Sequence, residues 1–184
     1  MKHLLSLSLM FCFSHAIAEE FNTLHRQQSS IGFVSKQMGV AVAGKFNTFS
    51  ADISVNPSKP ETGTARISID LNGLDAGSAE ANEELGNKSW FDSKRYPVAR
   101  FVSSRVVSLG NERYEALGAM TIKGKVLSVK APFTLKRLAG ALVVEGSFPI
   151  KRLDYGIGTG IWSDTSVVAD EVTIGFRFTV TTTR

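Results

Sequence analysis

Residues 172–180 read Val-Thr-Ile-Gly-Phe-Arg-Phe-Thr-Val, with a large apolar side chain at every second position from Val172 to Val180. Successive side chains of a β-strand point to opposite faces of the sheet, so this run predicts a strand with one apolar and one polar face. The same period of two recurs at residues 40–46, 49–55, 65–71 and 142–150. The sequence therefore predicts a protein built from strands that each bury one face.

Turn-forming residues separate these runs, notably Asn56 to Pro60, Asn72-Gly73, Gly110-Asn111 and Ala139-Gly140. Short strands divided by such turns are typical of an antiparallel sandwich or barrel. We expect an all-β protein of about eight strands. A barrel of that size is either filled by its own side chains or holds one small ligand, and the alternation alone leaves both open.

One segment breaks the alternation. Ser78 to Leu85 combines a helix N-cap residue, Glu80 in the first turn and good helix formers, and Gly86 follows it. We expect one short helix there and a further helical turn at residues 89–92. This excursion suits either a lid over one barrel mouth or a simple crossover whose aromatic residues fill the core.

The N-terminus has the three parts of a secretory signal peptide: Lys2, an apolar stretch from Leu4 to Phe13, and a small-residue end at Ala16-Ile17-Ala18. The apolar stretch is shorter than the roughly 20 residues that span a bilayer. We expect a signal peptide at residues 1–18, one domain at residues 19–184, and a periplasmic location. Cys12 does not mark a lipid anchor, because bulky Met10 and Phe11 precede it where small residues are required.

The chain after residue 18 has no cysteine and a single histidine, His25. Cysteine chemistry is thereby excluded, and one histidine is too few for a histidine-based metal site. We predict no metal and no cofactor other than a bound lipid. Without Lys2 the net charge is +3, and no basic run concentrates it. Nucleic acid is therefore not indicated, whereas transient contact with an anionic membrane surface is.

Carboxylates are the remaining source of catalytic chemistry. Asp154 and Asp164 lie in one predicted loop, and Asp170-Glu171 opens the last strand. Adjacent strand residues face opposite ways, so Asp170 and Glu171 cannot act together directly. We predict no catalytic residue, with turn and strand-edge hydrogen bonds as the role of these groups. The glycines at 156, 158 and 160 indicate a tightly bending loop rather than a phosphate loop.

Four segments after residue 18 carry specific motifs in a fixed order. The first runs from Ile31-Gly32-Phe33 to Phe46, and the third from Gly118 to Gly124. The second contains Trp90-Phe91-Asp92, and the last begins Asp154-Tyr155-Gly156-Ile157-Gly158. They are spread in this order over almost the whole region, and in this arrangement the chain resembles the YceI-like polyisoprenoid-binding family.

The resemblance implies an antiparallel lipocalin-like barrel whose apolar cavity holds a polyisoprenoid, isoprenoid quinones included. The residues that we predict to line the cavity or its lid are Phe33, Phe46, Phe49, Trp90, Phe91, Phe101, Met120, Phe148, Tyr155, Trp162 and Phe176. The family often carries Arg-Asp before its Trp/Phe-Phe element, where this chain has Ala81-Asn82. Headgroup preference is accordingly left open.

Three functions follow from this pattern. The first is a soluble periplasmic carrier or reservoir for a long-chain isoprenoid, which is not an enzyme. The second is an enzyme that acts on a lipid-like substrate through Asp154, Asp164 or Glu171. The third, an integral outer-membrane barrel, is disfavoured because such barrels end in an aromatic residue and this sequence ends Val180-Thr-Thr-Thr-Arg184. The sequence leaves open which lipid is held, whether it is stored or delivered, and the oligomeric state, a homodimer included.

Overall fold

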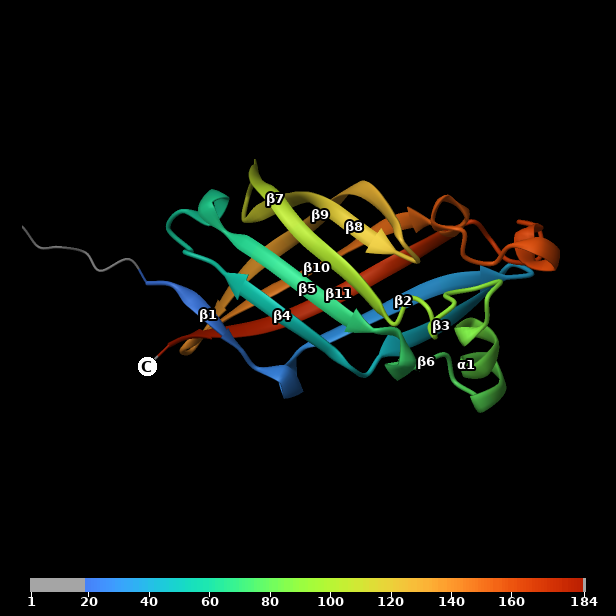
Figure 1. The fold of residues 1–184 in the computed structure, drawn as a ribbon. Coiled ribbons are helices and arrows are strands. Elements are labelled where there is room, and N and C mark those ends of the chain that lie inside the picture. The colour runs from blue at the N-terminus through green and yellow to red at the C-terminus, as the bar shows by residue number, and fades with distance from the viewer. Residues whose placement is uncertain (1–18, 184) are drawn as a thin grey trace, which may run out of the picture.

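The structure is a computed structural model that describes residues 19–183, which form a single curled antiparallel sheet of eleven strands with one α-helix (Figure 1). The predicted signal peptide lies outside the described residues. The strands are β1 (Phe21–Leu24), β2 (Ser30–Gln37), β3 (Val40–Phe46), β4 (Phe49–Ser54), β5 (Thr64–Asp70), β6 (Leu74–Asp75), β7 (Val98–Gly110), β8 (Arg113–Ile122), β9 (Lys125–Leu138), β10 (Ala141–Lys151) and β11 (Glu171–Thr182).

The strands follow the order β4-β5-β7-β8-β9-β10-β11-β2-β3-β6, and β1 pairs with β11 off this path. Phe21 of β1 also exchanges two backbone hydrogen bonds with Val55, just after β4, at N···O distances of 2.9 and 3.0 Å. This contact, which we call the seam, joins the two parts of the sheet and closes the curl at one point. The predicted all-β antiparallel fold is confirmed.

Three more strands are present than the predicted eight or so. The two shortest, β1 and β6, have four and two residues, too few to show a period of two. The five alternating runs found in the sequence coincide with β3, β4, β5, β10 and β11. Alternate residues of β11 reach the core, where Phe178 and Val180 are 1% and 0% exposed.

The predicted helix is confirmed as α1 (Ala79–Gly86), and its N-cap is Ser78, whose hydroxyl accepts a hydrogen bond from the Ala81 backbone N–H at 3.2 Å. The second helical turn expected at residues 89–92 is instead a series of tight turns, because Asp92 adopts a left-handed φ of 51°. No helix within residues 19–183 is long and apolar enough to cross a membrane.

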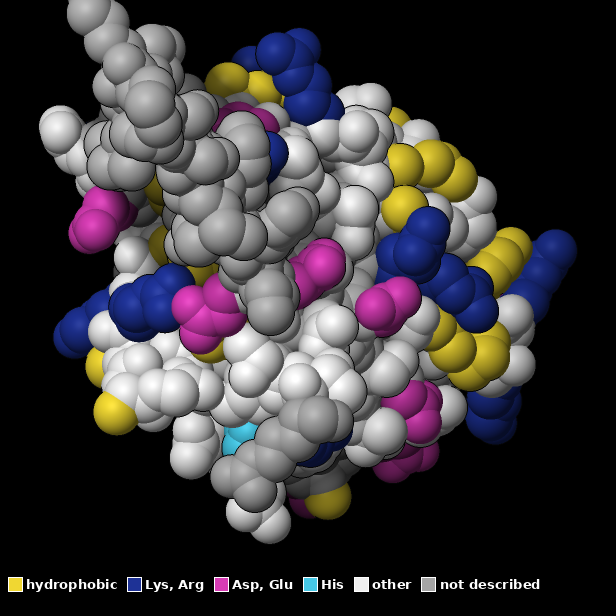
Figure 2. Space-filling view, turned by 90° about the vertical axis from the view of Figure 1, so that its left-hand side faces the viewer, with side chains coloured by type: hydrophobic (Ala, Val, Ile, Leu, Met, Phe, Trp, Pro, Cys, Tyr) yellow, Lys and Arg dark blue, Asp and Glu magenta, His cyan; other side chains and the backbone are white. Residues whose placement is uncertain are grey.

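Two segments cover one end of the curled sheet: residues 79–96, with α1 and the turns after it, and residues 152–168, the loop between β10 and β11 (Figure 1). The Ser89 carbonyl joins them by accepting from the Gly158 and Thr159 backbone N–H groups at 2.8 and 2.9 Å. We call these two segments the lid. The opposite end of the sheet, near the end of β11, mixes basic with acidic side chains (Figure 2).

Candidate functional site

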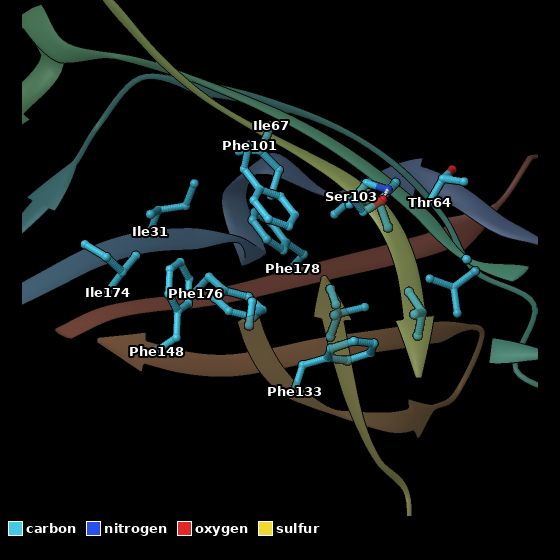
Figure 3. Close-up of a pocket in the computed structure, with 18 of the residues that line it drawn as sticks. Ile31, Thr64, Ile67, Phe101, Ser103, Phe133, Phe148, Ile174, Phe176 and Phe178 are labelled. Carbon is cyan, nitrogen blue, oxygen red and sulfur yellow. Dashed lines mark hydrogen bonds between the residues drawn. The ribbon is translucent and has the colours of Figure 1, made fainter. Parts of the chain in front are cut away.

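The interior of the curled sheet contains two apolar cavities. The one farther from the lid, the inner cavity, has a volume of about 90 Å³, and only Thr64 and Ser103 contribute polar side chains to it (Figure 3). Phenylalanine rings from β7, β9, β10 and β11 project into it, namely Phe101, Phe133, Phe148, Phe176 and Phe178. The rings reach the interior because they occupy the inward phase of their strands.

The second cavity, the lid cavity, lies beneath the lid and has a volume of about 280 Å³. Ile69, Met120 and Ile174 line both cavities, so the two spaces adjoin at these residues. For scale, an apolar cavity of about 150 Å³ in another protein stays dry and binds benzene. The interior thus offers two adjoining apolar cavities between the lid and the turn at Pro60, which share these three residues as a common wall.

Nine of the eleven predicted lining residues border these cavities. Met120 borders both, and the inner cavity also has Phe101, Phe148 and Phe176. The lid cavity is bordered by Phe33, Phe46, Trp90, Phe91 and Trp162. Trp90 and Phe91 belong to the turns after α1, so the predicted helical segment and its turns do lie over a cavity, as a lid would.

Phe49 and Tyr155 border neither apolar cavity. The Phe49 ring packs edge-on against Phe178, with centroids 6.0 Å apart, and the Arg26 guanidinium lies 3.6 Å from its centroid. Tyr155 instead borders a polar surface groove on the outside of the lid, beside Lys123 and Lys125. A residue on the inward-facing side of a strand is expected in the core, but the sequence does not say which parts of the core are empty.

Arg152, which the sequence interpretation missed, is buried beneath the lid with 1% of its surface exposed. Its guanidinium donates five hydrogen bonds to backbone carbonyls at 2.7–3.0 Å. The acceptors are the carbonyls of Ile157, Gly158, Trp162, Val168 and Ala169. Burial lowers the pKa of Arg152, and the charge of Asp170 partly opposes that shift.

The five hydrogen bonds decide the role of Arg152. A guanidinium has five N–H groups, and all of them here are used on the chain itself. Arg152 borders the lid cavity but has no donor left for a ligand headgroup. It therefore fixes the shape of the 152–168 loop. The sequence carried a signal for this position, since Arg152 follows Phe148 and Ile150 at every second residue and so is expected on the same inward face.

Glu84 connects the two tryptophans of the lid. The Trp90 and Trp162 rings lie 5.5 Å apart between centroids, at an angle of 53°. One carboxylate oxygen, Oε1 of Glu84, accepts from both indole N–H groups, at 3.0 and 2.9 Å. Because Trp90 and Trp162 belong to different lid segments, this single carboxylate holds the segments together over the cavity.

We expect Glu84→Leu to loosen the lid without unfolding the sheet. It leaves two part-buried indole N–H groups without an acceptor, at a cost of about 1–3 kcal/mol each. Hydrogen exchange of residues 84–96 and 157–163 should quicken, and tryptophan emission should shift to the red. The control is Glu83→Leu on the exposed side of α1. Equal exchange in the two variants would rule out this latch.

Asn82 occupies one of the two positions where the chain departs from the family pattern. Its side-chain oxygen Oδ1 accepts from the Ala76 backbone N–H at 2.7 Å and so ties α1 to the segment before it. Ala81, the other departing residue, borders the lid cavity. The helix is thus anchored by an amide rather than by an Arg-Asp pair.

The carboxylates considered as catalytic groups do not border the apolar cavities. Asp170 accepts from the Leu153 backbone N–H at 3.0 Å, and Asp164 accepts from the Ser166 hydroxyl and N–H, which lower its pKa. His25 is exposed, with Nε2 3.2 Å from the Thr181 hydroxyl. Within residues 19–183 no three His, Cys, Asp or Glu side chains are grouped to hold a metal ion.

The Tyr155 hydroxyl is buried and has no hydrogen-bond partner among residues 19–183. Burial raises the pKa of Tyr155 to about 12, and the charge of Asp154 adds to the shift. A tyrosine in an unfolded chain titrates near pH 10. The unfolded state therefore loses its proton first, and the stability contributed by Tyr155 is complete below about pH 10 and falls as the pH rises towards 12.

Tyr155→Phe should accordingly leave stability at neutral pH unchanged or slightly higher, since the lost hydroxyl had no partner. The variant should also lose less stability than the parent between about pH 10 and 12. Melting temperatures across this range measure both effects, with Tyr114→Phe as the matched control. Parallel melting curves for parent and Tyr155→Phe at every pH would contradict the expectation.

Comparison with known proteins agrees with this geometry. Residues 23–180 match the YceI-like domain. Among solved structures, BcnA of Burkholderia cenocepacia has a TM-score of 0.84 and 40% identity, covering 86% of this chain and 99% of that one. A polyisoprenoid binding domain from Saccharophagus degradans has a TM-score of 0.68 over 91% of this chain, and at 16% identity it supports the fold alone.

A UPF0312 protein of Vibrio parahaemolyticus is 30% identical over 108 residues, which is 57% of this chain and 57% of that relative. The match therefore spans less than two thirds of the relative's length. The domain match is far more extensive, since it covers all eleven strands except the ends of β1 and β11. By sequence and by fold, the chain belongs to the YceI-like family.

Proposed function

We propose that this protein is a periplasmic carrier or reservoir that holds a long-chain isoprenoid, an isoprenoid quinone or a polyprenyl lipid, in its adjoining apolar cavities. The observation that carries the proposal is the pair of adjoining apolar cavities between the lid and the turn at Pro60. Branched five-carbon units suit walls made of isoleucine, valine and phenylalanine. The polyisoprenoid binding domain from Saccharophagus degradans shares this fold, and we propose the same ligand class for this chain.

The energetics favour reversible carriage. Burial of a methylene is worth about 0.8 kcal/mol against water, so a five-carbon unit gains roughly 4 kcal/mol on leaving water. The relevant competitor is the bilayer, whose acyl chains are as apolar as the cavity wall. Transfer from membrane to cavity is then near balance, and the lid controls the rate of exchange. No chemical step on the lipid is required, and we propose a binding protein rather than an enzyme.

The location belongs to the same proposal. Residues 1–18 have the composition of an export signal, and an isoprenoid that leaves a membrane into water needs a container there. Cell fractionation with detection of the protein by antibody tests this directly. Recovery in the cytoplasmic fraction alone would contradict it.

The ligand is tested by purifying the protein from its native location without detergent, extracting it with organic solvent, and analysing the extract by mass spectrometry. A prenyl lipid in stoichiometric amount is the expected result. Folded protein that yields no lipid, and takes up none after incubation with quinones and polyprenyl lipids, would refute the proposal.

A further inference from the structure

The four most exposed large apolar side chains among residues 19–183 all lie around the lid end of the barrel. Ile161 is 87% exposed, Met38 73%, Val40 67% and Val126 62%. Single exposed apolar residues are ordinary, but several at one end of a molecule mark an interaction surface. We call these four residues the apolar tips.

The apolar tips come from three chain segments that contact one another. Met38 and Val40 flank the β2–β3 turn, and the Met38 backbone N–H donates to the Val167 carbonyl in the lid loop at 2.8 Å. Ile161 lies in the same lid loop. Val126 is the second residue of β9 and follows Lys125, whose ammonium donates to the lid carbonyl of Asp154 at 2.9 Å. The β2–β3 turn and the lid lie at the same end of the molecule (Figure 1).

A basic groove adjoins the tips. The groove is lined by four cationic side chains, those of Lys88, Arg95, Lys123 and Lys125, and by one carboxylate, that of Asp92. It extends to Gly160, which is next to Ile161 in the chain. Lys123 is held in place by donating to the Lys88 and Gly156 carbonyls at 2.8 and 2.7 Å. The opposite end of the barrel intersperses both signs of charge (Figure 2). Cations beside exposed apolar side chains match the headgroup layer of an anionic bilayer.

We propose that the lid end docks on an anionic phospholipid bilayer, with the apolar tips entering the headgroup boundary and the basic groove facing lipid phosphates. The inference rests on the proposed function, since a carrier of a membrane lipid must bring its opening against the membrane. It adds an orientation: the lid faces the bilayer and the Pro60 end faces away.

Each cation near an anionic surface strengthens binding about fivefold. The double variant Lys88→Gln/Arg95→Gln should therefore bind vesicles roughly 25-fold more weakly, with a smaller dependence on salt. Removing two apolar tips in Ile161→Ser/Met38→Ser should weaken binding about tenfold or more at any salt concentration. Lys123 and Lys125 are left unchanged in both variants because each donates hydrogen bonds to lid carbonyls.

The test is co-sedimentation of the purified protein with vesicles of phosphatidylglycerol and phosphatidylethanolamine, alongside vesicles of phosphatidylcholine alone. The matched control, Leu109→Ser/Lys59→Gln, removes an exposed apolar residue and a cation from elsewhere on the barrel. Docking predicts strong binding to the anionic vesicles, weakened in both lid variants and unchanged in the control. Equal binding by all proteins, equal binding to both vesicles, or no binding by the parent would overturn it.

Extraction of lipid from the same proteins separates this inference from the proposed function. Lid variants that retain an isoprenoid yet bind vesicles weakly support docking. If no protein holds an isoprenoid while vesicle binding still depends on the lid residues, docking stands and the carrier function fails.

Discussion

Replacing Arg152 with methionine is expected to lower the free energy of unfolding by about 3–5 kcal/mol. The guanidinium serves five backbone carbonyls, and methionine fills much of its volume without donating to any of them. In the variant these carbonyls would be left without the donor that Arg152 provides, and each would still carry the cost of its removal from water. Urea unfolding followed by tryptophan fluorescence measures the loss.

Two further variants test whether this loss of stability comes from the hydrogen bonds of Arg152. Arg66→Met changes an arginine whose side chain is 70% exposed and pairs with Asp52 at 3.6 Å, and it should cost less than about 1 kcal/mol. Arg152→Lys keeps the charge but offers three donors in place of five, so its loss should be intermediate. An unfolding midpoint of Arg152→Met equal to that of the parent would show that the lid loop does not depend on this side chain.

Ile174→Trp is expected to reduce bound long-chain isoprenoid at least tenfold. Ile174 is one of three residues that line both the inner and the lid cavity, and an indole there would block a chain that extends from one cavity into the other. A tenfold loss corresponds to about 1.4 kcal/mol, less than the cost of displacing a tryptophan from a packed site. A short prenyl alcohol that fits within the lid cavity should still bind.

The matched control is Thr173→Trp, the neighbouring residue on the outer face of β11, which is exposed. Mass spectrometry of extracts gives the lipid content, and thermal melting confirms that each variant is folded. Because a tryptophan at 174 can destabilise the sheet, Ile69→Trp places an indole between the two cavities from β5. Full occupancy by the long lipid in both folded variants would mean that the chain does not extend from one cavity into the other.

The sequence predicted what is local and periodic. The period of two located the long strands because burial of one face imposes it residue by residue, and Ser78 marked the start of α1 through its capping chemistry. The short strands β1 and β6 could not be found this way, since their pairing depends on distant partners. The family resemblance and the aromatic residues led to nine cavity residues, but they could not distinguish Phe49, packed against Phe178, from rings that border empty space.

The two charged residues of the site escaped prediction for a different reason. Lys, Arg, Asp and Glu are mostly exposed, and composition gives no reason to place Arg152 or Glu84 inside. Their positions carried a signal all the same. Arg152 shares the inward phase of Phe148 and Ile150, and Glu84 lies on the same face of α1 as Ala81 and Leu85.

The seam between Phe21 and Val55 also determines where the barrel is mechanically weakest. Strands β3 and β4 are consecutive in the chain yet unpaired, and the exchange at the seam amounts to two backbone hydrogen bonds. Parting β10 from β11 would instead break a ladder that runs from Ala141 to Lys151. We therefore expect thermal fluctuations that widen the interior to concentrate along the β3–β4 line. A ligand wider than the cavities would then be accommodated by movement of this flank, while the fully paired strands keep their positions.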